Sequence, residues 1–159
     1  MPVVPAYRSL LRTLGLLRRA MEPYFSRHGI SASQWWVLRA LSLAEEDGEE
    51  GIRLTDLSDR LLVRPPSVTG AIDRLQRTGL VSRATSETDQ RAKLVKLTVR
   101  GRQLVERVQA GHATRVQRVL DGLSRTEQRQ LRQLLDRLGD HLVEIADHDP
   151  RRRNGHSQQ

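Results

Sequence analysis

The sequence contains no cysteine, and its few aromatic residues make up 3% of its 159 residues. Without cysteine the chain has no disulfide framework, no thiolate metal ligand and no thiol-based redox switch. No apolar run approaches the length of a membrane span, and the stretch before Met21 lacks the apolar segment of a signal peptide. We therefore expect one compact domain, in the cytoplasm and away from membranes.

Signatures of enzymes and metal sites are also missing. The five histidines show no metal-binding spacing: His28, His112, His141, His148 and His156. Nucleophile elbows, phosphate loops and zinc-protease motifs do not occur. The sequence thus predicts a protein that is not an enzyme and that holds no cofactor or metal.

Basic residues are in excess, and their placement is uneven. The formal net charge is +8. Residues 53–102 contain eleven Lys and Arg against five Asp and Glu, whereas residues 44–51 contain five acidic residues and no basic one. A general preference for arginine over lysine explains the identity of the cations but not their position. The basic centre therefore indicates a surface that faces a polyanion.

Apolar residues spaced by three and four positions predict helices in the first third of the chain. A first helix is expected from Tyr7 to near Gly29, with one buried stripe: Leu10, Leu11, Leu14, Leu17 and Met21. A second, with Ser31 or Ser33 as its N-cap, is expected to reach Ala44 and to bury Trp35, Leu38, Leu41 and Leu43. After an exposed acidic turn, "GIR" fits a very short strand. Thr55 is then expected to cap a two-turn helix that has Leu54, Leu57 and Leu61 on one face.

The segment from Leu62 to Thr98 changes from helical spacing to strand alternation. Pro65 and Pro66 are suited to begin a helix, and Gly79 to end it. One face of this helix is apolar, with Val68, Ala71, Ile72 and Leu75, and the opposite face is small, polar or basic. "LVSR" and "KLVKLT" then predict an antiparallel hairpin with the long tip "ATSETDQRA".

Helical spacing returns after Gly101. A long helix, weakened around Gly111, is expected to precede a capping box formed by Ser124 and Glu127. The last helix follows that box, and residues 148–159 are expected to be a disordered tail. The fold class is thus mainly α with a small β-hairpin.

Two short helices followed by a basic hairpin make a winged helix-turn-helix, a fold that binds duplex DNA. A helix about 10 to 12 Å across fits a major groove about 12 Å wide, provided that its outer face is not bulky. Pro66, Ser67, Thr69 and Gly70 leave that face open. Arg64, Arg74 and Arg77 are suited to phosphates or base edges, and Arg91 at the hairpin tip is suited to a narrow minor groove.

The span from Leu54 to Gly101 resembles the core of the MarR family, the multiple antibiotic resistance type of transcription regulator. The matching pieces are "SQWWVLRAL", "SVTGAIDRLQRTGLV", the wing motif Asp89-Gln90-Arg91 and "LTVRG". The resemblance is close over residues 31–101 and follows the pattern of the flanking helices. One departure is Arg64, which stands where the family usually has a small polar cap.

The resemblance implies a homodimer that represses transcription from a near-palindromic operator until a small ligand releases it. Residues 30–101 would bind DNA, and residues 5–29 and 102–147 would form the helical dimerisation region. Arg91 would enter the minor groove, and Asp89 would brace the wing. The DNA-contacting residues would be Thr55, Arg64, Pro66, Ser67, Thr69, Gly70, Arg74, Arg77, Asp89, Gln90 and Arg91. A phenolic or aromatic ligand would contact Tyr24, His28 and Trp36.

Other interpretations remain open at this point. The chain fits an architectural or silencing DNA-binding protein without a ligand, and also a winged helix that binds proteins instead of DNA. Asp89 and Arg91 taken alone fit an ordinary surface pair worth less than about 1 kcal/mol. Tyr24, His28 and Trp36, each taken alone, fit plain packing.

Overall fold

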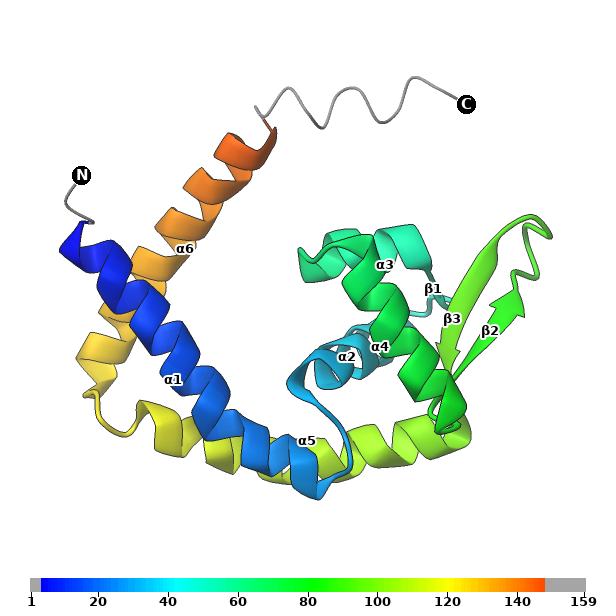
Figure 1. Ribbon diagram of the computed structural model, residues 1–159, viewed down its shortest axis with the longest axis horizontal. Coiled ribbons are helices and arrows are strands. Elements are labelled where there is room, and N and C mark those ends of the chain that lie inside the picture. The colour runs from blue at the N-terminus through cyan, green and yellow to red at the C-terminus, as the bar shows by residue number, and fades with distance from the viewer. Residues whose placement is uncertain (1–3, 148–159) are drawn as a thin grey trace. The chain divides into compact units, whose positions relative to one another are not determined.

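The computed structural model describes residues 4–147, and its elements follow the expected order (Figure 1). They are α1 (Pro5–Arg27), α2 (Ala32–Glu46), β1 (Ile52–Arg53), α3 (Leu54–Leu61), α4 (Pro65–Arg77), β2 (Val81–Thr85), β3 (Lys93–Leu97), α5 (Val99–Leu120) and α6 (Arg125–Asp147). The chain divides into two compact units, residues 1–116 and residues 117–159. In the part of the chain described, no helix combines the length and the apolar character that a bilayer crossing requires.

Local capping explains where α2 begins. The Ser31 hydroxyl accepts a hydrogen bond from the Gln34 backbone N–H at 3.2 Å, and the Gln34 side chain accepts one from the Ser31 N–H at 2.8 Å. This reciprocal capping box satisfies two amides that the first helical turn leaves unpaired. Of the two serines expected as N-cap, Ser31 is the one that serves. The helix continues to Glu46, two residues beyond its predicted end.

The expected cap of α3 was wrong. Arg53 is the N-cap, with no side-chain capping bond, and Thr55 lies within the first turn. The start of α3 is set instead by β1, because Ile52 and Arg53 pair with Val95 and Leu94 of β3 and the helix follows at once.

A tight turn joins α3 to α4. Leu62, the C-cap of α3, has φ of 53° and is 84% exposed. A leucine in the left-handed region is uncommon, since its Cβ crowds the backbone there. The turn therefore takes a strained, solvent-facing residue so that α4 begins immediately at Pro65.

The apolar face predicted for α4 is confirmed, because Val68, Ala71, Ile72 and Leu75 are all buried. Pro65 occupies the first turn, as expected from its missing N–H. The helix ends at Arg77, and Gly79 follows with φ of 72°, a conformation that glycine adopts without steric cost.

The strands form one antiparallel sheet in the order β1-β3-β2. Val81 pairs with Leu97 and Thr85 with Lys93, so that residues 86–92, here called the wing tip, connect β2 to β3. The predicted hairpin and the short preceding strand are both confirmed. Because β1 belongs to the same sheet as β2 and β3, helices α3 and α4 lie in the chain between the first strand of the sheet and the other two.

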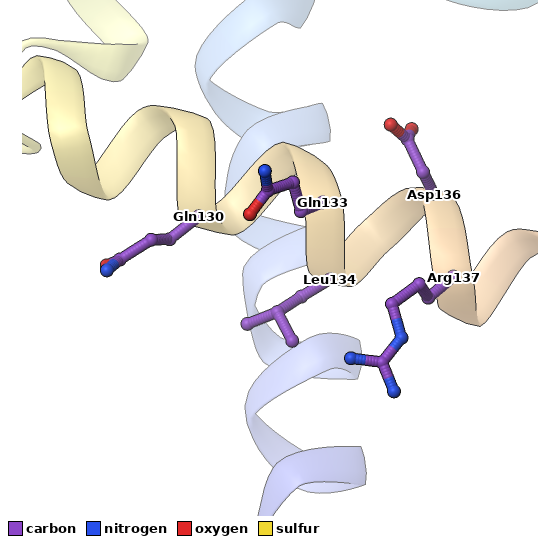
Figure 2. A pocket seen from close by; sticks show the side chains of 5 residues that line it. All are labelled: Gln130, Gln133, Leu134, Asp136 and Arg137. Atoms are coloured by element: carbon purple, nitrogen blue, oxygen red, sulfur yellow. The ribbon is translucent and has the colours of Figure 1, made fainter.

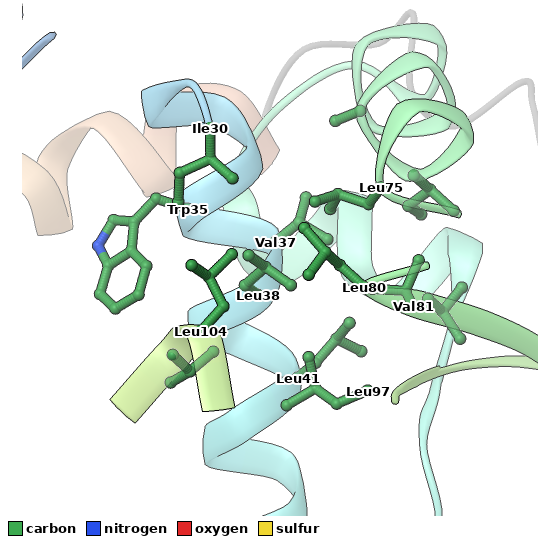
Figure 3. Packing of buried hydrophobic residues seen from close by; sticks show 14 of the residues in the cluster. Ile30, Trp35, Val37, Leu38, Leu41, Leu75, Leu80, Val81, Leu97 and Leu104 are labelled. Carbon is green, nitrogen blue, oxygen red and sulfur yellow. The ribbon is translucent and has the colours of Figure 1, made fainter. Parts of the chain in front are cut away.

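The core of the first unit gathers around α2, whose side chains meet α4, the sheet and the first half of α5 (Figure 3). Trp35, Leu38 and Leu41 are buried as predicted. Leu43, also predicted to be buried, is 43% exposed, and Val37 and Ala44 face the core instead. The apolar spacing of α2 is compatible with either face at its C-terminal end, which is why sequence periodicity chose the wrong residue.

The stripe on α1 is only partly buried. Met21 lies in the core, whereas Leu11, Leu14 and Leu17 are exposed in the single chain. The prediction of one buried stripe was therefore wrong for the first half of α1, since no neighbour within this unit covers it.

The long helix α5 runs without interruption through Gly111, so the expected weakening there is not observed. A Cβ added to Gly111 would lie 2.8 Å from the Tyr24 hydroxyl. The absence of a side chain at this position lets α1 pack closely against α5.

The second unit contains the predicted capping box. The Glu127 carboxylate accepts hydrogen bonds from the Ser124 backbone at 2.7 Å and from its hydroxyl at 2.6 Å. The helix α6 then exposes a row of apolar side chains: Leu131, Leu134, Leu135, Leu138, Leu142 and Ile145. Figure 2 shows Leu134 projecting from α6 among polar neighbours. The predicted tail, residues 148–159, lies outside the described residues.

Candidate nucleic-acid interface

The outer face of α4 combines small and basic side chains. Pro66, Ser67, Arg74 and Arg77 are exposed, while Thr69 and Gly70 are half-buried. An added Cβ at Gly70 would lie 3.5 Å from the Arg74 guanidinium, so Arg74 lies beside the glycine along the helix surface. The small side chains let another molecule approach this face closely, and its arginines are suited to bind phosphates or base edges.

Two further predicted residues lie close in sequence to α4. Arg64 is the N-cap of α4, but a guanidinium has no acceptor for the helix amides, so its side chain makes no capping bond. The Arg64 side chain is exposed. Thr55 is exposed in the first turn of α3, where its hydroxyl contacts the Asp56 carboxylate at 3.4 Å. Arg64 is therefore suited to backbone phosphate, whereas the Thr55 hydroxyl already has a neighbour within the chain.

Hydrogen bonds within the wing tip fix the backbone around Arg91. The Asp89 carboxylate accepts a hydrogen bond from the Arg91 backbone N–H at 3.0 Å and pairs with the Arg53 guanidinium at 3.1 Å. The Arg91 and Gln90 side chains are exposed. Asp89 thus links the tip to β1 and uses only the backbone of Arg91, so the arginine side chain is left exposed to bind an external anion.

One connection between helix and wing was missed by sequence reasoning. The Arg83 guanidinium of β2 donates to the Asp73 carboxylate at 2.7 Å and to the Gln76 side chain at 3.0 Å, both on α4. These bonds hold the outer helix and the hairpin as one unit. The helical spacing of α4 puts Asp73 opposite its apolar residues, but nothing in the sequence identified its partner.

The acidic segment, residues 44–51, is also more structured than its sequence suggested. Glu45 binds Arg102 of α5 with distances of 2.7 and 3.0 Å, and Glu49 binds Arg60 of α3 with distances of 2.7 and 2.9 Å. Hydrogen bonding to Arg60 lowers the pKa of Glu49. Exposed pairs of this kind contribute little to stability. Their effect is to neutralise two carboxylates of the segment with cations of other elements.

The three residues expected to bind a ligand do not form one group. Tyr24 and His28 lie edge to face with ring centroids 5.1 Å apart, and Tyr24 donates a hydrogen bond to the Val108 carbonyl. Burial raises the pKa of Tyr24. Trp36, 53% exposed, lines a separate hollow of about 370 Å³ between α2, α3 and α4.

The hollow beside Trp36 has an apolar lining and one cation. Its walls are formed by Ser33, Trp36, Val37, Arg60, Leu61, Val63, Ser67, Val68 and Ala71. A cavity of this size accommodates a small aromatic molecule. Its one cation, Arg60, already holds the Glu49 carboxylate through both terminal nitrogens of its guanidinium.

Metal binding finds no support in the part of the chain that the structure describes, where no three His, Asp or Glu side chains gather as ligands. Trp35 carries the single buried side-chain nitrogen without a partner among these residues.

Comparisons with known proteins agree with this geometry. A profile described as the MarR family matches residues 28–92. The HTH-type transcriptional regulator PecS of Dickeya dadantii is 30% identical over 135 residues, which are 85% of this chain and 80% of the relative. A crystal structure of a mutant of E. coli MarR in complex with operator DNA is 28% identical, with a TM-score of 0.76, and covers 85% of this chain and 94% of that one. A Mycobacterium tuberculosis MarR family protein in complex with salicylic acid is 27% identical, with a TM-score of 0.66, over 86% and 98% of the two chains.

Proposed function

This chain belongs to the MarR family of DNA-binding transcriptional regulators, and we propose that it represses transcription as a homodimer on a near-palindromic operator. The resemblance inferred from the sequence, the winged helix fold and the expectation of a regulator instead of an enzyme are confirmed by these relatives. The operator, the dimer and the ligand response are our proposals. Operator binding places its action in the cytoplasm, where the chromosome is accessible.

In this proposal α4 enters the major groove and the wing tip enters the adjacent minor groove. Ser67, Thr69 and Gly70 permit close approach, and Arg74 contacts a base edge or phosphate. Arg91 inserts where the negative potential of a narrow groove is strongest. The observation that carries the proposal is the Asp89 carboxylate, which binds the Arg91 backbone and Arg53 and leaves the Arg91 side chain exposed.

Exposed leucines support the homodimer. Leu11, Leu14 and Leu17 of α1 and a longer apolar row on α6 are uncovered in the single chain. Apolar surface of this extent is normally buried by a partner in a stable protein. A two-fold dimer would present two copies of α4 to half-sites about one DNA turn, roughly 10 base pairs, apart.

For the ligand we propose a small aromatic acid in the hollow beside Trp36. The ring would pack on Trp36 and Ala71, and the carboxylate would lie near Arg60, where it would compete with the Glu49 carboxylate for the guanidinium. Because Ser67 and Val68 of α4 line the same hollow, a ligand bound there would contact the DNA-contacting helix directly. Such a ligand weakens DNA binding only as far as it prefers the DNA-free arrangement. Tyr24 and His28, in this proposal, contribute packing between α1 and α5.

Selection of duplexes from a random pool by the wild-type protein tests DNA recognition. We expect an enriched near-palindrome bound roughly 10³-fold more tightly than a scrambled duplex, with affinity falling steeply as salt rises. Enrichment of A·T-rich duplexes without a shared motif would favour the architectural alternative. No binding to any duplex in dilute buffer would favour the protein-interaction alternative. The ligand site is then tested by repeating the DNA-binding measurement with salicylate, for the wild-type protein and for Trp36→Ala.

A further inference from the structure

Glu50 joins the acidic segment to the wing tip. One oxygen of its carboxylate accepts hydrogen bonds from the Glu87 backbone N–H at 2.9 Å and from the Lys96 ammonium at 3.0 Å. The other accepts one from the Ser86 hydroxyl at 2.9 Å. A residue that precedes β1 therefore holds both the first residues of the tip and the strand that follows it.

The bond to Ser86 determines how the rest of the tip is held. Ser86 is 6% exposed, and its hydroxyl has one proton and two lone pairs. Because the proton is donated to Glu50, the lone pairs remain available for the backbone N–H groups of Thr88 at 3.2 Å and Asp89 at 3.3 Å. Without a carboxylate at residue 50 the hydroxyl loses this acceptor, and the Thr88 hydroxyl, 3.0 Å away, is the other oxygen to which it can donate. Donation to Thr88 would turn the lone pairs of Ser86 away from the two amides.

This network reaches Arg91 through Asp89. The Ser86 N–H donates to the Ala92 carbonyl at 3.0 Å, and the Ala92 N–H donates to the Asp89 carbonyl at 2.9 Å. The Asp89 side chain then accepts from the Arg91 N–H at 3.0 Å. The backbone that carries Arg91 is therefore held by bonds to Ser86 and Asp89, and Glu50 in turn holds Ser86.

We propose that Glu50 is a positioning residue for DNA binding, which orders the wing tip so that Arg91 is presented to the minor groove. This role rests on the proposed function. It assigns a binding purpose to a carboxylate whose charge, by itself, opposes an approaching phosphate backbone.

The sign of the effect separates positioning from simple electrostatics. Loss of a negative charge near DNA strengthens binding if charge alone matters, because repulsion from phosphates is reduced. Loss of the tip geometry weakens it. Glu50→Ala is therefore expected to weaken binding about tenfold, the size of one lost charge-assisted hydrogen-bond network. Glu50→Gln keeps an acceptor oxygen and is expected to weaken binding about threefold.

Glu46→Gln is the matched control. Glu46 lies in the same acidic segment and pairs with Arg39 on its own helix at 3.1 Å. The substitution removes the same charge without touching the tip, so affinity is expected to stay equal or rise slightly.

The experiment measures affinity of full-length variants for the best duplex from the wild-type selection and for a scrambled duplex, at fixed salt. A double-mutant cycle with Arg91→Ala completes it, because positioning predicts that Glu50→Ala costs little once Arg91 is gone. Thermal unfolding identifies any variant that fails to fold, and Glu50→Gln then carries the test.

Weakened binding by Glu50 variants together with non-additivity supports the proposal. Equal or tighter binding by Glu50→Ala, or full additivity with Arg91→Ala, overturns it while the proposed function stands. If the wild-type protein distinguishes no duplex from the scrambled one, the proposed function fails, and the role of Glu50 fails with it.

Discussion

Tyr24 on α1 donates its hydroxyl proton to the backbone carbonyl of Val108 on α5, directly beside the bare Cα of Gly111. The bond crosses 84 residues of sequence and satisfies a buried phenol. Burial without this partner would cost free energy, since a polar group removed from water needs a hydrogen bond. The contact therefore joins the first helix to the long helix that follows the wing.

Replacing this phenol tests the contact. Tyr24→Phe keeps the ring but removes the donor, and we expect the free energy of unfolding to fall by about 1 kcal/mol. Chemical denaturation of both proteins at one protein concentration measures the change. Tyr7→Phe, at an exposed tyrosine of the same helix, is the control and should leave stability unchanged. Equal stability of Tyr24→Phe and wild type would contradict the assigned role of the hydroxyl.

Two glycines in helices are expected to respond oppositely to alanine. A Cβ at Gly101 would lie 2.0 Å from the Leu80 carbonyl oxygen, and a Cβ at Gly139 meets no atom within 4 Å. Gly101→Ala should destabilise the protein by about 3 kcal/mol or more, because backbone has to move. Gly139→Ala should stabilise it by up to about 1 kcal/mol through helix propensity. Thermal unfolding distinguishes the two, and a stable Gly101→Ala would show that the close approach is wrong.

Arg91 is expected to dominate the contribution of the wing. Arg91→Ala should weaken operator affinity by at least about tenfold while the dimer persists, because the lost contact lies only on the DNA face. A mobility-shift titration at fixed salt measures affinity, and light scattering measures the mass. Arg107→Ala removes the same charge from an exposed position of α5 and serves as the control. Unchanged binding by Arg91→Ala would refute the minor-groove assignment.

His112 of α5, whose ring lies near the rings of Tyr24, Phe25 and Trp35, predicts a pH dependence of stability. Burial, and then the charge of Arg39, lowers the pKa of His112 from its usual value of about 6.5. The unfolded chain therefore takes up a proton that the native chain resists, so stability is lost as pH falls below about 6.5 towards the lower native pKa. His112→Phe keeps the ring against Tyr24 and Trp35 and should flatten this loss. The melting temperature between pH 5 and 8 measures it, and parallel curves for both proteins would rule out His112.

Dimerisation is expected to depend on the apolar row of α6. Leu134 is 61% exposed in the single chain, and Leu134→Glu places a charge where the proposed partner would bury a leucine. We expect dissociation at micromolar concentration, measured by light scattering, together with loss of operator binding. Gln133→Glu adds the same charge on the polar side of the helix and should stay dimeric. A Leu134→Glu protein that stays dimeric would show that Leu134 is not part of the dimer interface.

Sequence periodicity predicted the order of the elements because most of them bury one regular face. The apolar face of α4 and the capping box at Ser124 depend on residues within one turn, so they were visible in the sequence, whereas the N-cap of α2 was left open between Ser31 and Ser33. The cap expected at Thr55 failed because strand pairing with a distant segment, not local capping, fixes the start of α3.

Contacts of the site that join distant segments were not predictable in the same way. Residues 44–51 read as a solvated turn, yet Glu50 reaches Ser86 and Lys96 across 36 and 46 positions. The sequence shows the charges but not which partners the fold brings near them. Likewise, the exposed Leu14 of α1 fits the helical pattern of a buried residue, since periodicity does not distinguish a core from an uncovered surface.

The strand order β1-β3-β2 also bears on how the protein acquires its native state. The pairing of Ile52 with Val95 closes a loop that contains both helices of the helix-turn-helix and the whole of β2. Closing so long a loop is entropically costly and repaid only when its contents are packed. Helix α4 and the wing tip should therefore fold and unfold together as one cooperative unit. A molecule whose hairpin has opened should not retain an α4 that binds DNA by itself.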